Sequence, residues 1–444
     1  LPDGRLLVLP FERLRPVLAP LFELFGEASI DEAAGTLRLT RRNAGDLALL
    51  EAATAGSNIA WSGGEAIRIL GRQLRDHGGL PPCAVPPGFT AVLRPYQQQG
   101  LDWLQFLRSA GLGGVLADDM GLGKTVQALA HLAVEQAEGR AEAPSLVICP
   151  TSLVENWRAE AYRFAPNLRC LVLHGADRAS RFEAIGTHDV VITTYPLLAR
   201  DHAVLLAQDW HVVVLDEAQT IKNPQATVSK LTRTLKARQR LCLSGTPLEN
   251  HLGELWSLFD FLMPGFLGDR RQFGSRYRGP IEKGGDHERQ ALLARRIAPF
   301  LLRRTKEQVA PELPAKTEIT ETVTMGEAQR AIYEGIRLAM HAKVRAAVAR
   351  RGVAGSGIVI LDALLKLRQA CCDPRLLKLS AAKAAKAKSA KLERLFELLL
   401  PLLEEGRRVL LFSQFTSMLA LVEAELVQLS LPYVLLTGDT RDRA

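Results

Sequence analysis

Asp118-Asp119-Met120-Gly121-Leu122-Gly123-Lys124-Thr125 is the part of the sequence that decides the fold. It follows an apolar run, 114–117, and precedes apolar residues at helical spacing. A glycine-rich turn between a strand and a helix is the context of a phosphate-binding loop, in which backbone N–H groups and the positive end of the helix dipole surround a polyphosphate. In such a loop Lys124 reaches the β- and γ-phosphates and the Thr125 hydroxyl binds Mg²⁺. Asp118 stands where the usual pattern has its first glycine, so the eight residues alone leave a plain surface turn as the alternative.

The size and composition are those of a globular protein with more than one domain. The chain has 444 residues, of which 47% are apolar and 23% are charged, and one hydrophobic core rarely grows past about 250–300 residues. No apolar run reaches the roughly 18 residues that cross a bilayer, and the N-terminus lacks the pattern of a signal peptide, so no membrane partner is predicted. Six cysteines without a C-x-x-C pair argue against zinc and for reduced thiols in the cytoplasm.

The positive charge of the chain is concentrated in one segment. The formal net charge is +8, and residues 341–391 contain twelve Lys or Arg against two Asp or Glu, so the remainder of the chain is slightly negative. A basic segment on a nearly neutral body is typical of proteins that bind nucleic acid. A solvated helical face is the alternative that charge by itself leaves open.

Beyond the loop, apolar runs alternate with helical patterns, which predicts a parallel α/β sheet. The runs are 145–149, 189–195, 211–215 and 240–243. The third ends in Asp216-Glu217, and an acidic pair at the carboxyl end of a buried strand suits a site where Asp216 holds Mg²⁺ and Glu217 polarises the attacking water. Capping of a helix by Asp216 is the alternative.

Two further segments carry chemistry that the residues alone leave open. Ser244-Gly245-Thr246 follows the fourth run, and its hydroxyl groups would sense a γ-phosphate or simply form a tight turn. Leu93-Arg94-Pro95-Tyr96-Gln97 leads into an amphipathic helix. The amide of Gln97 offers a donor and an acceptor to the edge of an adenine ring, and a polar helix start is the alternative.

Taken together, these motifs resemble those of the Swi/Snf-type ATPases, the chromatin-remodeller branch of the superfamily-two helicases, and in particular their bacterial members. An acid at position 118 is itself a feature of that family, whereas Asp216-Glu-Ala-Gln219 departs from its more familiar ending in histidine. The matching segments, in chain order, are 93–97, 118–125, 149–157, 193–195, 216–219, 243–250, 254–258, 300–306, 365–369, 371–374 and 409–415.

The resemblance implies an α/β fold with two RecA-like lobes and ATP between them. The expected domains are a small N-terminal accessory module at 1–80, a linker at 81–92, a first RecA-like parallel-sheet lobe at 93–258, helical insertions that form protrusions and a brace at 259–388, and a partial second RecA-like lobe at 389–444. The run 409–415 is expected to be the first strand of that second lobe, which the sequence leaves incomplete.

The resemblance also implies roles for individual residues. Catalysis is expected from Glu217, Asp216 and Lys124, and Mg²⁺ binding from Thr125 and Asp216. ATP would be bound by Arg94, Gln97, Asp118, Gly121, Leu122, Gly123, Lys124 and Thr125. Coupling between the ATP and nucleic-acid sites is expected from Ser244, Gly245 and Thr246, and contact with the backbone of nucleic acid from Pro150, Thr151, Ser152, Thr193 and Thr194. Contacts to phosphate carry no sequence information, so binding should be independent of sequence.

The function so implied is that of an ATP-dependent translocase on double-stranded DNA, with ATP and Mg²⁺ as cofactors. RNA polymerase or another nucleoprotein complex is the further partner expected, and the location is a bacterial cytoplasm, beside the nucleoid. A strand-separating DNA or RNA helicase is one alternative. The other is a nucleotide-binding module without efficient turnover, because no arginine-rich motif of a second lobe follows residue 436 in this sequence.

Overall fold

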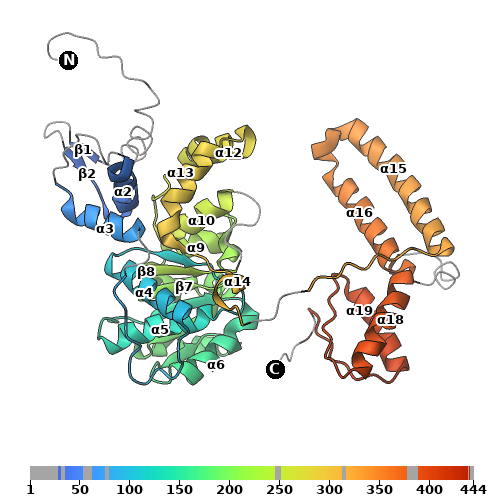
Figure 1. The fold of residues 1–444 in the computed structure, drawn as a ribbon, viewed down its shortest axis with the longest axis horizontal. Coiled ribbons are helices and arrows are strands. Elements are labelled where there is room, and N and C mark those ends of the chain that lie inside the picture. The colour runs from blue at the N-terminus through green and yellow to red at the C-terminus, as the bar shows by residue number, and fades with distance from the viewer. Residues whose placement is uncertain are drawn as a thin grey trace, which may run out of the picture. The chain divides into compact units, whose positions relative to one another are not determined.

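The computed structural model describes residues 29–31, 36–53, 63–75, 80–245, 252–312, 317–377, 389–438 and 440. Contacts divide the chain into two compact units, Leu1–Pro314 and Ala315–Ala444 (Figure 1). The sequence predicted domain boundaries at 258 and 388. The structure instead has one division, after Pro314, because residues 259–312 pack with the first unit.

A seven-stranded sheet forms the centre of the first unit, with the strand order β5-β6-β4-β7-β8-β3-β9. Every neighbouring pair in it is parallel. The strands are β3 (Gly114–Leu116), β4 (Ser145–Cys149), β5 (Cys170–Val172), β6 (Val190–Thr194), β7 (Asp209–Leu215), β8 (Lys236–Leu243) and β9 (Leu301–Leu302). β4 and β6 are buried along their whole length, as continuous apolar runs in parallel sheets are when both faces are covered. The predicted α/β sheet is therefore confirmed.

Helices connect the strands and share one hydrophobic core with them. They are α4 (Pro95–Ser109), α5 (Lys124–Ala137), α6 (Val154–Phe164), α7 (Tyr195–Arg200), α8 (His202–Ala207), α9 (Thr227–Thr234), α10 (Leu252–Leu262), α11 (Arg270–Phe273), α12 (Gly279–Gly284), α13 (His287–Ile297) and α14 (Lys306–Val309). Because the strands are parallel, the loops after their carboxyl ends meet at one edge of the sheet, where ligands of open α/β sheets bind.

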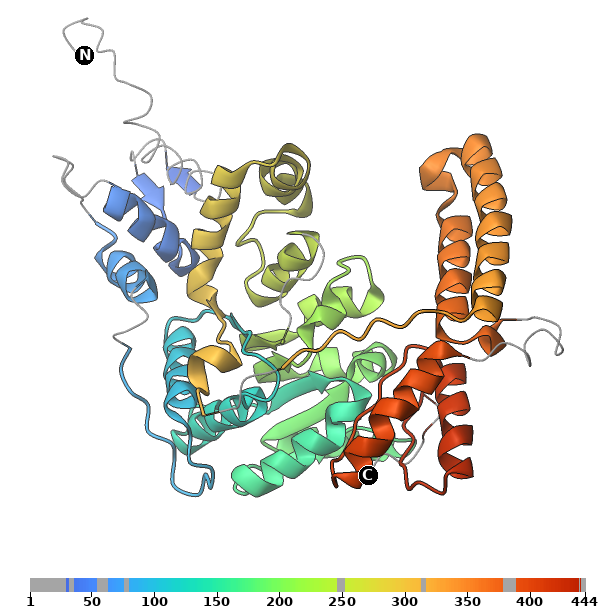
Figure 2. The same ribbon diagram turned by 45° about the vertical axis from the view of Figure 1, so that its right-hand side comes forward.

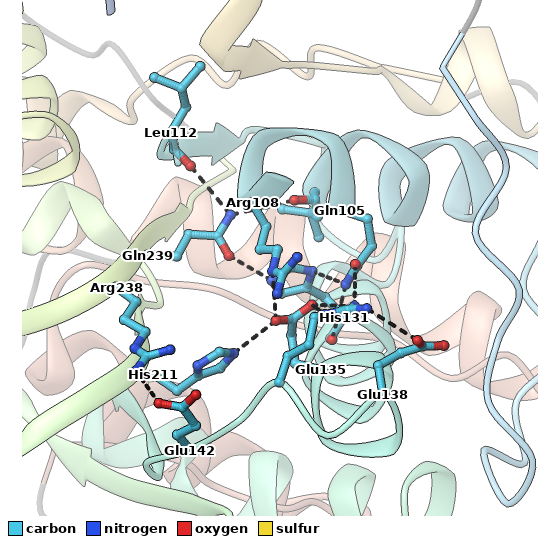
Figure 3. Close-up of polar contacts among 12 residues, drawn as sticks. Gln105, Arg108, Leu112, His131, Glu135, Glu138, Glu142, His211, Arg238 and Gln239 are labelled. Carbon is cyan, nitrogen blue, oxygen red and sulfur yellow. Dashed lines mark hydrogen bonds and ion pairs between the residues drawn. The ribbon is translucent and has the colours of Figure 1, made fainter. Parts of the chain in front are cut away.

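A buried polar network lies where α4 and α5 meet β7 and β8, away from the phosphate loop (Figure 3). Glu135 of α5 is fully buried, and its carboxylate accepts from Arg108 at 2.9 Å, Arg140 at 2.6 Å and His211 at 2.9 Å. Burial alone would raise the pKa of Glu135, but the hydrogen bonds from His211 and Arg140 hold it well below its usual range. This ionised, paired carboxylate anchors the far end of the helix that begins at the phosphate loop.

His131, one turn before Glu135 on α5, is neutral for a geometric reason. Its Nδ1 accepts from the amide Nε2 of Gln105 at 2.9 Å, so its Nε2 must carry the proton that bonds to Oε1 of Gln239, also at 2.9 Å. A second proton on Nδ1 would face the Gln105 amide donor. Burial accordingly lowers the pKa of His131 to about 4.

The described residues between Ser29 and Arg75 pack within the first unit. A hairpin of β1 (Ser29–Asp31) and β2 (Thr36–Arg38) precedes α2 (Ala44–Ala53) and α3 (Glu65–Arg75). Helices α2 and α13 lie side by side in both ribbon views (Figure 2). Between them Asp46 and Arg296 form an ion pair at 3.2 Å, with side chains 3% and 1% exposed. The Arg296 guanidinium also lies 4.9 Å from the centre of the Phe266 ring.

The second unit is helical in its described residues. It contains α15 (Glu327–Gly355), interrupted in its helical geometry at Gly352, then α16 (Gly357–Cys372), α18 (Ala390–Glu404) and α19 (Thr416–Gln428). Helices α15 and α16 form a long hairpin (Figure 2), which carries much of the basic segment. None of the described helices is long and apolar enough to cross a membrane.

The strand expected at 409–415 is not formed. The described residues of the second unit contain no strand, and the side chains of Leu410 and Phe412 are 84% and 89% exposed. An isolated extended segment gains nothing from its apolar side chains, because a parallel strand needs paired neighbours and covered faces. A hydrophobic cluster in this unit is formed instead by α18 and α19, through Leu392, Met418 and Val422.

Candidate nucleotide-binding site

The phosphate loop connects β3 to α5 with the geometry that its glycines allow. Gly121 and Gly123 have φ angles of 84° and 75°, in the left-handed region that only glycine adopts without strain. A Cβ on Gly123 would in addition lie 2.5 Å from Nε2 of Gln97. Lys124 is the first residue of α5, so the expected order of strand, turn and helix is present.

Lys124 extends across the loop toward a group of acids. Its Nζ donates to the carbonyl oxygens of Asp118 at 2.7 Å and Asp119 at 3.3 Å. Burial lowers the pKa of the Lys124 ammonium, an effect that nearby carboxylates, Glu217 foremost, partly oppose. The cation expected at the phosphates and the acids expected at the metal therefore lie within electrostatic reach of each other.

Asp216 is held at the end of β7 by groups from two other elements. Its carboxylate accepts from Nε1 of Trp157 at 2.8 Å and from the N–H of Glu217 at 2.9 Å, and its carbonyl accepts from the Tyr195 hydroxyl at 2.7 Å. Burial raises the pKa of Asp216, and the hydrogen bonds to its carboxylate partly offset this. The carboxylate thus binds an indole rather than capping a helix. Sequence reasoning did not name Trp157 or Tyr195 as site residues, although both lie in the matching segments 149–157 and 193–195.

Glu217 and Ser244 are joined through one amide. Nε2 of Gln219 donates to the Glu217 carboxylate at 2.6 Å, and the Ser244 hydroxyl donates to Oε1 of Gln219 at 3.0 Å. Glu217 has a φ of 47°, a left-handed conformation that costs a residue with a side chain about 1–2 kcal/mol and often marks functional sites. The loop that holds the candidate base is therefore tied to the residue expected to couple the two sites. Thr246 lies outside the described residues.

Two residues of the segment 93–97 contact the phosphate loop directly. The Tyr96 hydroxyl and the Gln97 Nε2 both donate to the carbonyl oxygen of Leu122 at 3.2 Å. Oε1 of Gln97 accepts the N–H of Arg94 at 2.9 Å, and the Arg94 guanidinium forms an exposed ion pair with Glu312. Gln97, one of the two residues expected to bind adenine, therefore also contacts the loop on which the phosphates would rest.

The side chain of Asp118 is buried beneath the phosphate loop, and its expected role in ATP binding stays a prediction. The resemblance assigns it to ATP binding, but its side chain is fully buried and its carboxylate pairs with Arg304, Nε to Oδ1 at 2.9 Å and Nη2 to Oδ2 at 2.5 Å. Gln127 donates to the same carboxylate at 3.2 Å. Because these partners occupy it away from solvent, Asp118 supports the loop from beneath, and only its carbonyl oxygen faces Lys124.

The donor groups at this edge fit Mg²⁺. Thr125 is half-buried beside Lys124, and it offers a hydroxyl oxygen, while Asp216 offers a carboxylate, both of which are hard oxygen ligands. In the described part of the chain no group of three or more His, Cys, Asp or Glu could enclose a metal. Mg²⁺ suits such a site, since it usually keeps several waters and takes one or two protein ligands together with substrate phosphates.

The residues expected to contact nucleic acid divide into two sets. Pro150, Thr151 and Ser152 lie directly after β4, in a short 3₁₀ turn where Thr151 and Ser152 are exposed. Thr193 and Thr194 are 0% and 1% exposed within β6, and the Thr193 hydroxyl donates to the carbonyl of Leu173 at 3.2 Å. Both side chains are enclosed in this structure because β6 pairs with a strand on either side and is buried along its length, and their contact with a DNA backbone stays a prediction.

Comparison with known proteins agrees with the motifs and the geometry. The family model of the SNF2-related domain matches residues 96–376. The Bacillus subtilis protein YwqA, named an ATP-dependent helicase/translocase, is 39% identical over 372 residues, 82% of this chain and 40% of that protein. The yeast TATA-binding protein-associated factor MOT1 is 36% identical over 69% of this chain and 18% of its own length.

A solved structure extends the likeness to three dimensions. The Sulfolobus solfataricus SWI2/SNF2 ATPase core in complex with dsDNA matches with a TM-score of 0.50 and 36% identity, over 78% of this chain and 72% of its own. The chain spans less than half the length of the two relatives compared above. With its RecA-like parallel sheet and a family match over more than half of its residues, the chain belongs to the SNF2-related family.

Proposed function

We propose that this chain is the nucleotide-binding part of an ATP-dependent translocase that moves along double-stranded DNA. The observation that carries the proposal is the convergence of Lys124, Asp216 and Glu217 at the phosphate-loop edge of the sheet, in a chain of the SNF2-related family. Binding of a polyphosphate, ligation of a divalent cation and activation of water need these three kinds of group together.

Each residue has a distinct part in this proposal. Lys124 exchanges its two carbonyl partners in the loop for phosphate oxygens when ATP binds. Thr125 and Asp216 would hold Mg²⁺, which when bound would neutralise charge on the phosphates. Glu217 accepts a proton from the attacking water, and the 2.8 Å hydrogen bond from Trp157 orients the neighbouring Asp216 carboxylate and opposes the rise in its pKa that burial causes.

The bond from Gln219 to Glu217 supports a route by which the nucleotide state would reach the rest of the unit. A water that lies beside the γ-phosphate and donates a hydrogen bond to the Glu217 carboxylate would compete with the 2.6 Å bond from Gln219 and weaken it. The Ser244 hydroxyl, bonded to the same amide, then shifts at the end of β8. Ser244, Gly245 and Thr246 thereby act as the coupling segment.

Double-stranded DNA is the proposed track. The exposed hydroxyls of Thr151 and Ser152 can donate to phosphate oxygens, and Arg345 and Arg350 of α15 are exposed cations. Such contacts give binding that ignores sequence and weakens with salt. The solved SWI2/SNF2 ATPase core bound to dsDNA supports this choice. RNA polymerase or another nucleoprotein complex is the proposed target, in a bacterial cytoplasm beside the nucleoid.

The test uses the full-length natural protein that contains this chain. ATP turnover should rise when duplex DNA is added, and Glu217→Gln should bind ATP as tightly as wild type while hydrolysing it about 10²–10⁴-fold more slowly. Displacement of a third strand from a DNA triplex, without separation of the duplex, marks a translocase. Separation of the duplex would instead support the strand-separating helicase, and turnover that ignores DNA would overturn the proposal.

A further inference from the structure

Residues 301–306 run beside the phosphate loop and are fixed to it through the main chain. β9 pairs with β3, and beyond the strand the N–H of Ala117 donates to Leu302 at 2.7 Å and that of Asp119 to Arg304 at 3.0 Å. The N–H of Lys306 donates to Oδ2 of Asp119 at 3.1 Å. The backbone of Lys306 is therefore held against the loop 187 positions away in the sequence.

The side chain of Lys306 extends over the loop, and its ammonium has no partner among the described residues. Its Nζ lies 3.7 Å from the point where a Cβ on Gly121 would stand. The residue is exposed, and its ammonium makes no hydrogen bond or ion pair with any residue that the structure describes. The Asp119 carboxylate bonds the main chain of Lys306 and not its ammonium.

We propose that Lys306 is a second lysine that binds the polyphosphate of the nucleotide, opposite Lys124. The inference rests on the proposed function, and it adds a contact from a segment that the phosphate-loop motif does not include. In this arrangement the backbone N–H groups of the loop face the polyphosphate. The ammonium of Lys124 contacts it from the buried side of the loop, and the ammonium of Lys306 contacts it from the solvent-exposed side. Because its main chain is already fixed, Lys306 loses only side-chain freedom when it contacts a phosphate.

A contact of this kind has an electrostatic signature. Its strength grows with the number of phosphates, so ATP gains most, ADP less and AMP almost nothing. The side chain is exposed, so salt screens the interaction more than it screens that of the half-buried Lys124. For an exposed charge pair we expect a change of about 3- to 10-fold in affinity at low salt.

The experiment compares Lys306→Ala, Lys306→Arg and Lys124→Ala with wild type by calorimetric titration of ATP, ADP and AMP at low and high salt. Lys230→Ala is the matched control, because Lys230 is an exposed lysine on α9. Lys306→Ala should weaken ATP about 3- to 10-fold at low salt, ADP less and AMP not at all, and Lys306→Arg should restore most of the affinity. Tryptophan fluorescence during denaturation checks that each variant folds.

The outcomes separate this inference from the proposed function. Unchanged ATP affinity in Lys306→Ala, beside weaker binding in Lys124→Ala, would overturn the role of Lys306 alone. An equal weakening for ATP, ADP and AMP would also overturn it, since that pattern indicates a damaged loop. If wild type binds no nucleotide, or Lys124→Ala binds as wild type does, the proposed nucleotide site itself is wrong and the role of Lys306 falls with it.

Discussion

Replacing Arg304 by alanine should destabilise the first unit strongly, because the buried charge of Asp118 would lose its counter-ion. The Asp118 side chain is fully buried and that of Arg304 is 10% exposed. The guanidinium also donates to Gln127 at 2.9 Å and lies over the Tyr96 ring, 5.3 Å from its centre. In Arg304→Ala, Asp118 would keep one amide donor, from Gln127, and the main-chain N–H of residue 304.

The expected magnitude follows from this geometry. Breaking one side of a buried, hydrogen-bonded ion pair costs about 3–5 kcal/mol, since the remaining charge stays in a poorly solvated site. Domains are typically stable by only about 5–15 kcal/mol, so this cost is a large share of the total. Removing the charge as well, in Asp118→Asn with Arg304→Ala, should return about 2 kcal/mol or more of it.

Guanidinium denaturation followed by tryptophan fluorescence measures the first unit selectively. All five tryptophans of the chain lie at positions 61, 103, 157, 210 and 256, within Leu1–Pro314. The control is Arg303→Ala, an exposed neighbour of the same type, which should change the free energy of unfolding by less than about 0.5 kcal/mol. Equal effects of Arg303→Ala and Arg304→Ala, or a double variant no more stable than Arg304→Ala, would refute the reasoning.

Three further outcomes are expected. The folded-state pKa of His131, about 4, lies below its usual 6.5, so the unfolded chain binds more protons between these values and the free energy of unfolding should fall as the pH falls from 6.5 to 4, by up to about 3 kcal/mol. His131→Gln should flatten that decline, and equal pH slopes in variant and wild type would contradict the assignment. Arg296→Ala, which breaks the buried pair with the N-terminal helices, should cost about 3–5 kcal/mol, whereas the exposed Arg295→Ala should be neutral in the same denaturation assay. Log K for the binding of duplex DNA falls as log salt rises, and alanine at Arg345 and Arg350 should make this fall shallower, by about 0.9 in slope for each phosphate that these arginines neutralise in wild type. An unchanged slope would remove α15 from the DNA interface.

Local patterns were enough for the sheet and the phosphate loop. Strands β4 and β7 contain the apolar runs 146–149 and 212–215, and the loop needs left-handed glycines at 121 and 123. Such signals depend on residues close together in the chain, so they can be read without knowing the fold. Asp216 and Glu217 were predictable for the same reason, since the carboxyl ends of parallel strands meet at one edge.

Partners distant in the sequence were not predictable. Arg304 lies 186 positions from Asp118, and the strand that brings it there, Leu301–Leu302, is too short to give a pattern. The motif at 300–306 marked Arg304 and Lys306 as part of a family resemblance without indicating that both contact the phosphate loop. Which buried charge receives which partner is decided by the order of strands, and β9 takes its place beside β3 only in the folded sheet.

The sequence by itself thus determined the parallel α/β sheet, the phosphate loop and the acidic pair, because short-range periodicity and backbone geometry encode them. Only the tertiary structure decided how exposed each side chain is. Thr193 and Thr194 are buried in the fold, although the sequence predicted that they contact nucleic acid. Leu410 and Phe412 are exposed, although the sequence predicted a strand there. The physical reason is the same in both cases: burial depends on the neighbours that the fold supplies on either side, and a segment does not contain its neighbours.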